Sequence, residues 1–431
     1  MNEYDSNRIL DFVKKINYHL TKSLKDTDCY VLNTCHIREK ATDKVYHEVG
    51  RLKKEFKDKK KPIILIAGCV AQAEGDFLLK KEKYIDAVIG PQSYHEINKI
   101  ILAAEKKYSK KNFTEFETIE KFDHLNLIKN TNNKVSSFLT IQEGCDKFCK
   151  FCVVPYTRGP ECSRPFSEII NEAKQLVDNG VKEIVLLGQN VNAYNYKQKK
   201  LSNLLYSINE IEGLERIRYT TSHPKDFSDD LIKAHFDCEK LMPLLHLPIQ
   251  SGSNKILKDM NRNHTIEEYL DIINKLKETK TNIKFSSDFI IAYPGETDND
   301  FKQTLDLLNK IKFINSYSFI FSSRPGTPAA KMVKIEEQIA RERLLIFQNR
   351  ANFLKTEYRN QLINFRAKVL FENKLKNENE YFGRDEYFNS VVVKNKADLR
   401  GKTLFVKINN CNQNTLFGEV TNNNDYKEYA A

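Results

Sequence analysis

Residues 143–164 read "EGCDKFCKFCVVPYTRGPECSR" and contain the densest group of cysteines in the chain, because three of its nine cysteines fall within eight positions. Their spacing is C-x3-C-x2-C, at Cys145, Cys149 and Cys152. Residues at i, i+4 and i+7 could share one face of a helix, which is the plain structural alternative. Gly144 before the group and Pro155 after it are typical of a loop rather than a helix interior. The pattern therefore predicts a loop that binds a metal.

The spacing of these cysteines is compatible with two kinds of metal site, a zinc site and an iron–sulfur cluster. Structural zinc sites use four Cys or His ligands, and Cys162 lies close enough along the chain to supply the fourth. Iron–sulfur clusters also take closely spaced thiolates, and a four-iron cluster held by only three protein ligands leaves one iron open for chemistry. The spacing favours the iron–sulfur cluster and leaves zinc as the alternative.

Strand and helix patterns alternate on both sides of this loop. Six apolar segments of strand length are separated by amphipathic helical segments; they are SFLTIQEGC, KEIVLLGQN, RIRYTTSHP, LMPLLHLPIQ, IKFSSDFIIAYPG and SYSFIFSSRPG. Six strand–helix units are two short of an eight-fold barrel. We therefore predict a partial (β/α)6 barrel with a trailing helix over residues 135–362, with the cysteine loop at the carboxyl end of its first strand.

The N-terminal residues 1–105 show the same alternation on a smaller scale. CYVLNTC and KPIILIAGCV are predicted strands that end at Cys35 and Cys69, and IDAVIGP is a third. Such alternation predicts a parallel α/β domain with its functional groups at the carboxyl ends of the strands. Residues 106–134 are polar and without clear period, which predicts a linker.

The C-terminal residues 363–431 have a different character, with short alternating strands separated by Gly, Asn and Asp turns. This pattern predicts a small antiparallel β-barrel, an architecture that often binds oligonucleotides; a plain domain for stability or dimerisation is the alternative. Four of its side chains could stack on bases or form the barrel's own core: Phe382, Arg384, Tyr387 and Phe388.

The composition of the 431-residue chain indicates which kinds of partner the protein could bind. The formal net charge of +11 suits a polyanion such as RNA, although a genome rich in A and T would produce the same excess of lysine. The chain shows no long uncharged apolar run and no basic-then-apolar leader, so we expect a cytoplasmic protein that does not bind a membrane and keeps its thiols reduced.

A resemblance to a known family covers nearly the whole chain. Its phrases, in order, are NEYDS, NTCHIREKATDK, AGCVAQAEG, IQEGCDKFCKFCVVPYTRG, LLGQNVNAY, TSHP, HLPIQSGSNKILKDMNR, IIAYPGETDNDF and FSSRPGTPAAKM. They resemble the radical S-adenosylmethionine (SAM) methylthiotransferases, and most closely the branch that acts on isopentenyladenosine in tRNA. The resemblance implies an N-terminal methylthiotransferase domain, a radical SAM core, and a C-terminal TRAM domain that holds RNA.

The resemblance also implies two 4Fe–4S clusters. Cys145, Cys149 and Cys152 would hold the cluster that binds SAM, while Cys35 and Cys69 match two of the three ligands of an auxiliary cluster that carries sulfur. In the family the third ligand precedes the NEYDS phrase, which here begins at the second residue. We expect either a start codon placed too late or a true truncation. Cys29 could substitute, but its place within a strand favours a core residue.

Further polar residues near the predicted strand ends are candidates to bind SAM. They are Gln189, Asn190, Ser222, His246, Gln250 and Asp288. A helix N-cap is the alternative for Asn190, and a satisfied core histidine is the alternative for His246. Arg158 and Arg164 could meet the carboxylate of SAM or an RNA phosphate.

The activity that the resemblance implies is addition of a methylthio group to carbon two of isopentenyladenosine next to the tRNA anticodon. The expected partners are that tRNA, an electron donor protein and a sulfur source, and the expected state is a monomer. One alternative is methylthiolation of threonylcarbamoyladenosine or of a ribosomal protein. Another is a non-catalytic RNA-binding metalloprotein.

Overall fold

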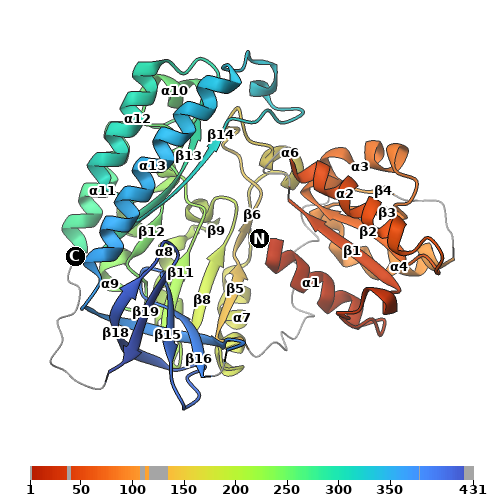
Figure 1. Cartoon of the computed structure of the whole chain (residues 1–431), viewed down its shortest axis with the longest axis horizontal. Helices are drawn as coiled ribbons and strands as arrows, with labels where there is room; N and C mark the ends of the chain where they lie inside the picture. The colour runs from red at the N-terminus through yellow and green to blue at the C-terminus, as the bar shows by residue number, and fades with distance from the viewer. Residues whose placement is uncertain (1, 36–39, 107–111, 116–133, 378, 422–431) are drawn as a thin grey trace. The chain divides into compact units, whose positions relative to one another are not determined.

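The computed structural model describes residues 2–35, 40–106, 112–115, 134–377 and 379–421 (Figure 1). The chain forms two compact units. The first contains residues 1–130, 143–164 and 322–332, and the second contains residues 131–142, 165–321 and 333–431. The cysteine loop therefore belongs to the unit that contains the N-terminal sheet.

A four-stranded parallel sheet forms the centre of the first unit, with strand order β1-β2-β3-β4. Its strands are β1 (Cys29–Thr34), β2 (Ile63–Gly68), β3 (Ala87–Ile89) and β4 (Asn112–Phe113). The three strands predicted from the N-terminal alternation are confirmed. Strand β4 lies inside the segment that was predicted to be a linker.

Helices cover both faces of this sheet (Figure 1). One apolar core joins β2 and β3 to α1 (Asn2–Lys14), η2 (Pro91–Glu96) and α4 (Ile97–Glu105). The other joins the opposite face of β2 to α2 (Lys40–Glu55) and α3 (Cys69–Lys81). Alternate residues of β2 point to opposite faces, so its fully buried run feeds both cores. Helix α1 was not predicted, because its residues entered the sequence reasoning only as a motif.

Two strand ends of this sheet approach each other unusually closely. Thr34 and Gly68 are register partners, and the Thr34 hydroxyl donates a hydrogen bond of 2.6 Å to the Ala67 carbonyl. Gly68 has φ +93° and ψ −161°, a region that only glycine occupies readily. A Cβ on Gly68 would lie 2.2 Å from the Thr34 carbonyl oxygen. Glycine at this position therefore lets the two strands end side by side.

Six parallel strands form the barrel portion of the second unit, as predicted. They pair as two sheets of three, β11-β8-β5 and β12-β13-β14, and a parallel bridge between Ile217 and Leu241 links the two. The strands are β5 (Ser136–Thr140), β8 (Glu183–Leu187), β11 (Arg216–Tyr219), β12 (Leu244–His246), β13 (Lys284–Ile291) and β14 (Asn315–Ile320).

Helices between these strands bury their apolar faces in one large core. They are α7 (Phe166–Asp178), α8 (Leu201–Asn209), α9 (Asp229–Asp237), α10 (Asn254–Asp259), α11 (Ile266–Thr279) and α12 (Asp298–Ile311). The long helix α13 (Glu337–Gln361) follows β14 and packs on it. Capping boxes at Thr265 and Thr297 start α11 and α12 at defined residues.

The C-terminal strands close into a small barrel of order β15-β16-β17-β19-β18. They are β15 (Arg366–Lys374), β16 (Glu380–Arg384), β17 (Ser390–Lys394), β18 (Thr403–Cys411) and β19 (Thr415–Val420). All pairs are antiparallel except β17 with β19. The predicted fold class, a parallel α/β domain, a partial (β/α)6 barrel and a small C-terminal β-barrel, is confirmed.

Within the second unit, two buried arginines of β11 connect this small barrel to the six-stranded partial barrel. The guanidinium of Arg216 donates to the carbonyls of Arg384 and Lys368, each at 2.8 Å. The guanidinium of Arg218 donates to the carbonyls of Asp385 and Glu386 at 2.8 and 2.9 Å. These bonds use backbone groups of the small barrel, so they depend on its fold rather than on its side chains.

In the described part of the chain, no helix combines the length and the apolar character needed to cross a bilayer. The four-part division of the chain at residues 105, 134 and 362 stays a prediction.

Gly68→Ala is predicted to lower the free energy of unfolding by at least about 2 kcal/mol, because alanine must adopt a backbone region reserved for glycine and also collides with Thr34. The matched control is Gly50→Ala on helix α2, where a new Cβ meets nothing within 4 Å. That change should raise the free energy by about 0.5–1 kcal/mol. Urea unfolding of the full chain, followed by circular dichroism, checks both; equal stabilities for the two variants would contradict the prediction.

Candidate functional site

The cysteine loop is closed at its neck by backbone groups. The amide of Cys145 donates a hydrogen bond of 3.2 Å to the carbonyl of Gly159. Gly144 has φ +79°, and a Cβ there would lie 1.8 Å from the carbonyl oxygen of Pro160. The chain between Cys145 and Cys152 contains no helix. The alternative that the three cysteines share a helical face is therefore wrong.

The three thiols of the loop lie in a largely buried environment. Cys149 is buried, and Cys145 and Cys152 are partly buried. Burial, with smaller contributions from negative charge on Cys152 and Cys149, raises the pKa of the Cys145 thiol to about 12, against the opposing effect of a hydrogen bond from the Lys147 backbone. Thiolates gathered in this way repel one another unless a cation binds between them. Three thiols in one closed loop thus suit an iron–sulfur cluster as donors.

In the described ranges, no group of three or more His, Cys, Asp or Glu side chains is arranged as a finished metal site. The assignment of Cys145, Cys149 and Cys152 as ligands consequently stays a prediction that rests on their spacing and shared loop.

Two exposed aromatic side chains border the cysteine loop. Phe148 is 53% exposed and has φ +45°, and its ring meets that of Tyr156 edge to face with 6.3 Å between centroids. A bulky residue with positive φ is strained, and such strain is concentrated at functional sites. The carbonyl of Lys150, within the loop, accepts a hydrogen bond of 3.0 Å from the amide of Ala329. The spacing of the cysteines did not predict the exposed, strained Phe148.

The two arginines that follow the loop are buried. Arg158 is 5% exposed and its guanidinium pairs with Asp5 at 2.5 Å and with Glu143 at 3.5 Å. Arg164 is also buried. The guanidinium of Arg158 is occupied by two carboxylates of the protein, and the prediction that these arginines meet the carboxylate of SAM or an RNA phosphate stays a prediction.

Cys35 and Cys69 lie next to each other at the carboxyl end of the N-terminal sheet. They directly follow Thr34 and Gly68, which are register partners on adjacent parallel strands. Neighbouring strands are about 4.8 Å apart, so the two cysteines emerge side by side. Cys29 begins β1, and six residues of strand put it about 20 Å from this edge. Cys29 is partly buried and packs against the apolar core of the sheet, which agrees with the interpretation from the sequence, and burial raises the pKa of its thiol to about 12.

Gln189 and Asn190 form the turn after β8. The side-chain oxygen of Gln142 accepts hydrogen bonds from both of their amides, at 3.0 and 3.1 Å. The side chain of Asn190 donates to Asp226 at 2.7 Å. Asn190 lies at the N-cap position of η4 (Val191–Ala193), but its side chain makes no capping hydrogen bond. Asp226 and Gln142, which the sequence reasoning missed, hold this turn.

Strained backbone marks the next three strand ends of the barrel. Thr221 after β11, Gln250 after β12 and Ala292 after β13 have φ of +67°, +76° and +58°. None of them is glycine, and such outliers persist only where the surrounding structure enforces them. The Ser222 hydroxyl beside this strain is buried and has no hydrogen-bond partner among the described residues. A polar ligand would satisfy it.

A buried carboxylate supports the strained turn at Ala292. Glu296 accepts hydrogen bonds from the amide of Ala292 at 3.1 Å and from Arg343 at 2.9 Å. Burial raises the pKa of Glu296 to about 7, against the opposing effect of Arg343. The sequence reasoning identified only the neighbouring Pro-Gly turn, because nothing in the sequence pairs Glu296 with a helix 47 residues away.

His246 and Asp288 form a second group within the barrel strands. The ring nitrogen Nε2 of His246 lies 3.5 Å from a carboxylate oxygen of Asp288, and Nδ1 lies 2.9 Å from the Ser286 hydroxyl. The Tyr317 ring meets the His246 ring edge to face at 6.0 Å. Both predicted residues are thus brought together, because His246 is the last residue of β12 and Asp288 lies within the neighbouring strand β13.

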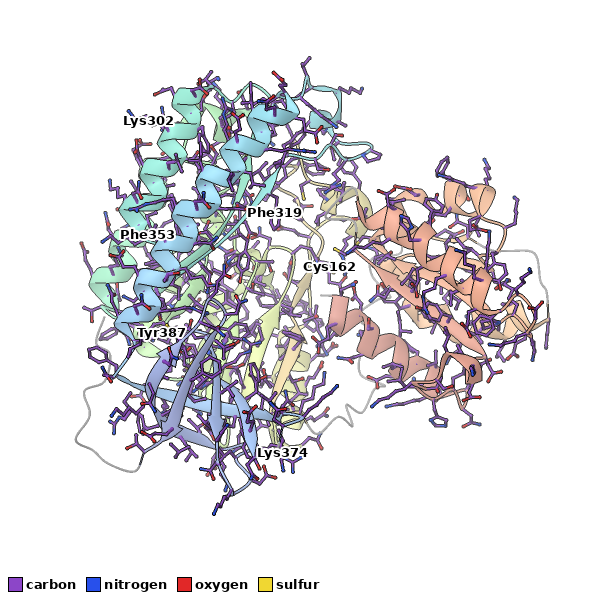
Figure 2. The ribbon with its side chains drawn as sticks, viewed as in Figure 1. Cys162, Lys302, Phe319, Phe353, Lys374 and Tyr387 are labelled. Atoms are coloured by element: carbon purple, nitrogen blue, oxygen red, sulfur yellow. The ribbon has the colours of Figure 1, made fainter. Side chains whose placement is uncertain are left out.

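The C-terminal aromatics divide into core and surface. Tyr387, labelled in Figure 2, is one of them. It is buried, and its hydroxyl donates a hydrogen bond of 3.0 Å to the carbonyl of Asn282. Phe388 is 41% exposed, has φ +63°, and lies against the guanidinium groups of Arg384 and Arg218, 4.0 and 5.0 Å from its ring centroid. Tyr387 is therefore part of the apolar core, and the prediction of stacking on a base remains for the exposed Phe388.

Family models match two parts of the chain. The radical SAM superfamily matches residues 139–308, and a family described as uncharacterized protein family UPF0004 matches residues 1–90. The first match includes the cysteine loop, and the second includes Cys35 and Cys69.

Curated relatives match nearly the full length. The chain is 58% identical over 431 residues to the tRNA-2-methylthio-N(6)-dimethylallyladenosine synthase of Pelagibacter ubique, covering 99% of this chain and 97% of the relative. It is 46% identical to the synthase of the same name from Rickettsia canadensis, covering 97% of each.

A solved structure shares the fold at low sequence identity. The radical SAM methyltransferase TsrM from Kitasatospora setae, determined with cobalamin and a [4Fe-4S] cluster, superposes with a TM-score of 0.59 and 12% identity over 77% of this chain and 71% of that one. The curated relatives share 58% and 46% of their aligned residues with this chain and match it over nearly its full length. The chain therefore belongs to the tRNA-2-methylthio-N(6)-dimethylallyladenosine synthase family of radical SAM enzymes.

Proposed function

We propose that this chain is a radical SAM transferase that adds a methylthio group to carbon two of N(6)-isopentenyladenosine in tRNA. The observation that carries the proposal is the 58% identity over 99% of the chain to a curated synthase of that name. The residues on which the chemistry depends lie inside the matched length, including the cysteine loop and the strand-end thiols.

The enzyme uses an iron–sulfur cluster and SAM, as the radical SAM family does. When bound, the cluster and SAM supply the radical chemistry that activates a carbon–hydrogen bond of the substrate. Cys145, Cys149 and Cys152 would hold the cluster. The buried Ser222 hydroxyl, beside the strained turn at Thr221, would bind and orient a polar ligand; its support is that it has no hydrogen-bond partner among the described residues.

A second 4Fe–4S cluster is part of the proposal. Its support is the adjacency of Cys35 and Cys69 at one edge of the N-terminal sheet. Within the described ranges, no other strand of that sheet is directly followed by a cysteine. The source of a third ligand is left open, and the distant position of Cys29 makes it unsuitable.

The tRNA is proposed to contact the C-terminal barrel. Phe388 is exposed beside two guanidinium groups, and this combination of aromatic ring and positive charge suits stacking on a nucleobase near phosphates. An electron donor protein, a sulfur source, a monomeric state and a cytoplasmic location complete the proposal.

The first test uses anaerobically reconstituted chain with tRNA that carries isopentenyladenosine. Formation of 2-methylthio-isopentenyladenosine and of 5′-deoxyadenosine is expected, and Cys149→Ala should abolish both because the cluster loses a ligand. Cys411→Ser, in the C-terminal barrel, is the matched control and should change neither. Nucleoside analysis by mass spectrometry measures the products.

A different product would overturn the assignment in a specific way. Modified threonylcarbamoyladenosine or a modified ribosomal protein would move the activity to another branch. Zinc in place of iron, with no 5′-deoxyadenosine, would indicate a non-catalytic RNA-binding protein.

Cys35→Ala and Cys69→Ala are predicted to separate the two halves of the reaction. SAM cleavage should persist, because the cysteine loop is intact, while methylthiolation should be lost with the auxiliary cluster. Cys29→Ala is the control and should retain both activities, since Cys29 lies at the opposite end of β1. Equal loss of methylthiolation in all three variants would contradict the auxiliary site.

Phe388→Ala is predicted to weaken tRNA binding by about 1–3 kcal/mol, a factor of roughly 5 to 150 in Kd, because a stacked base loses its aromatic partner. Phe417→Ala, at a similarly exposed phenylalanine of the same barrel, is the matched control. Fluorescence anisotropy with labelled tRNA measures the affinity, and SAM cleavage without RNA should not change. Equal affinities for the two variants would remove Phe388 from the interface.

A further inference from the structure

Arg158 joins both arms of the cysteine loop to the N-terminal helix. It ends α6 (Val154–Arg158), on the arm that leaves the loop, whereas Glu143 lies on the arm that enters it. One guanidinium contacts the carboxylates of Glu143 and of Asp5 on α1, a residue 153 positions away. The two arms of the loop and α1 therefore share a single ionic contact.

The backbone of Arg158 is held as firmly as its side chain. Its carbonyl accepts a hydrogen bond of 2.7 Å from the buried side chain of Gln92 in η2. The guanidinium also lies near enough to Cys69, the first residue of α3, to interact with it electrostatically. Arg158 is thus in contact or in electrostatic reach of α1, η2 and the start of α3, around the edge where Cys35 and Cys69 emerge.

Asp5, Glu143 and Arg158 carry buried charges, and removing these charges from water costs free energy that apolar side chains at the same positions would not. Asp5, Glu143 and Arg158 are each 5% exposed or less, and two carboxylates share one guanidinium. Oδ1 of Asp5 has no hydrogen-bond partner among the described residues. Apolar side chains of similar volume often stabilise a buried site equally well, whereas ionic contacts specify one arrangement.

We infer that Arg158 is a positioning residue that holds the loop of Cys145, Cys149 and Cys152 at a set distance from Cys35 and Cys69. The inference rests on the proposed function, in which the two sets of thiols serve one substrate carbon. A displacement of about 1 Å is enough to cost an enzyme about 100-fold in rate. Arg158 would consequently control the coupling between SAM cleavage and sulfur insertion rather than either step alone.

The test compares Arg158→Lys, Arg158→Met and Asp5→Asn with a matched control in the full chain. The control is Arg51→Lys, which alters an exposed ion pair with Glu48 in the same unit. For each protein, the iron content, the 5′-deoxyadenosine formed without RNA, and the methylthio product per 5′-deoxyadenosine with tRNA are measured. Hydrogen exchange of residues 143–158 is followed in the chain before reconstitution.

The three variants at Arg158 and Asp5 should retain iron and SAM cleavage, while the methylthio product per 5′-deoxyadenosine falls by about tenfold or more. Arg158→Lys should retain more coupling than Arg158→Met because it keeps the charge. Residues 143–158 should exchange faster in all three, and Arg51→Lys should match the wild type.

A parallel fall of SAM cleavage and product would show that Arg158 only stabilises the fold and would overturn the inference, as would unchanged coupling. If the wild-type chain cleaves SAM but forms no methylthio product, the proposed function fails instead. In that case the inference is still tested by hydrogen exchange: if residues 143–158 exchange at the wild-type rate in the Arg158 and Asp5 variants, the inference is overturned.

Discussion

Parallel pairing is the constraint on which both units depend. Parallel strands end at the same edge of their sheet, so residues that directly follow them are gathered there whatever their separation in sequence. Cys35 and Cys69, 34 positions apart in the chain, become neighbours because Thr34 and Gly68 are register partners. In the barrel, the same geometry brings together the turns at Asn190, Thr221 and Gln250. The candidate site residues at Cys35, Cys69 and Asn190 are found at these edges.

Close approach at these edges requires unusual backbone. Gly68 permits two strand ends to meet, and Gly144 permits the neck of the cysteine loop to close against Pro160. In the barrel, Thr221, Gln250 and Ala292 adopt positive φ without being glycine. Buried polar groups compensate this strain, as Glu296 does for the turn at Ala292. Within each unit, the surrounding contacts hold these residues in their unusual conformations.

The C-terminal barrel is held in place by backbone contacts. Arg216 and Arg218 bond to its backbone carbonyls, so its position in the second unit does not depend on which side chains it displays. Its surface residues are not used in these bonds, and Phe388 is one of the side chains that it exposes. Tyr387, next to it in sequence, serves the interface through Asn282. Alternation of side chains along a strand could not separate the two, because residues 385–389 form a turn organised by Asp385.

The sequence by itself determined the fold class, the six barrel strands and the strand-end positions of Cys35 and Cys69, because hydrophobic period and turn residues are local signals. The spacing of Cys145, Cys149 and Cys152 was equally readable. Only the tertiary structure decided that Arg158 is enclosed by Asp5 and Glu143, that Cys29 lies at the far end of its strand, and that Glu296 supports Ala292. Each of these depends on contacts between residues that are far apart in the sequence. A local sequence pattern does not specify which distant residues will pack together in the folded chain.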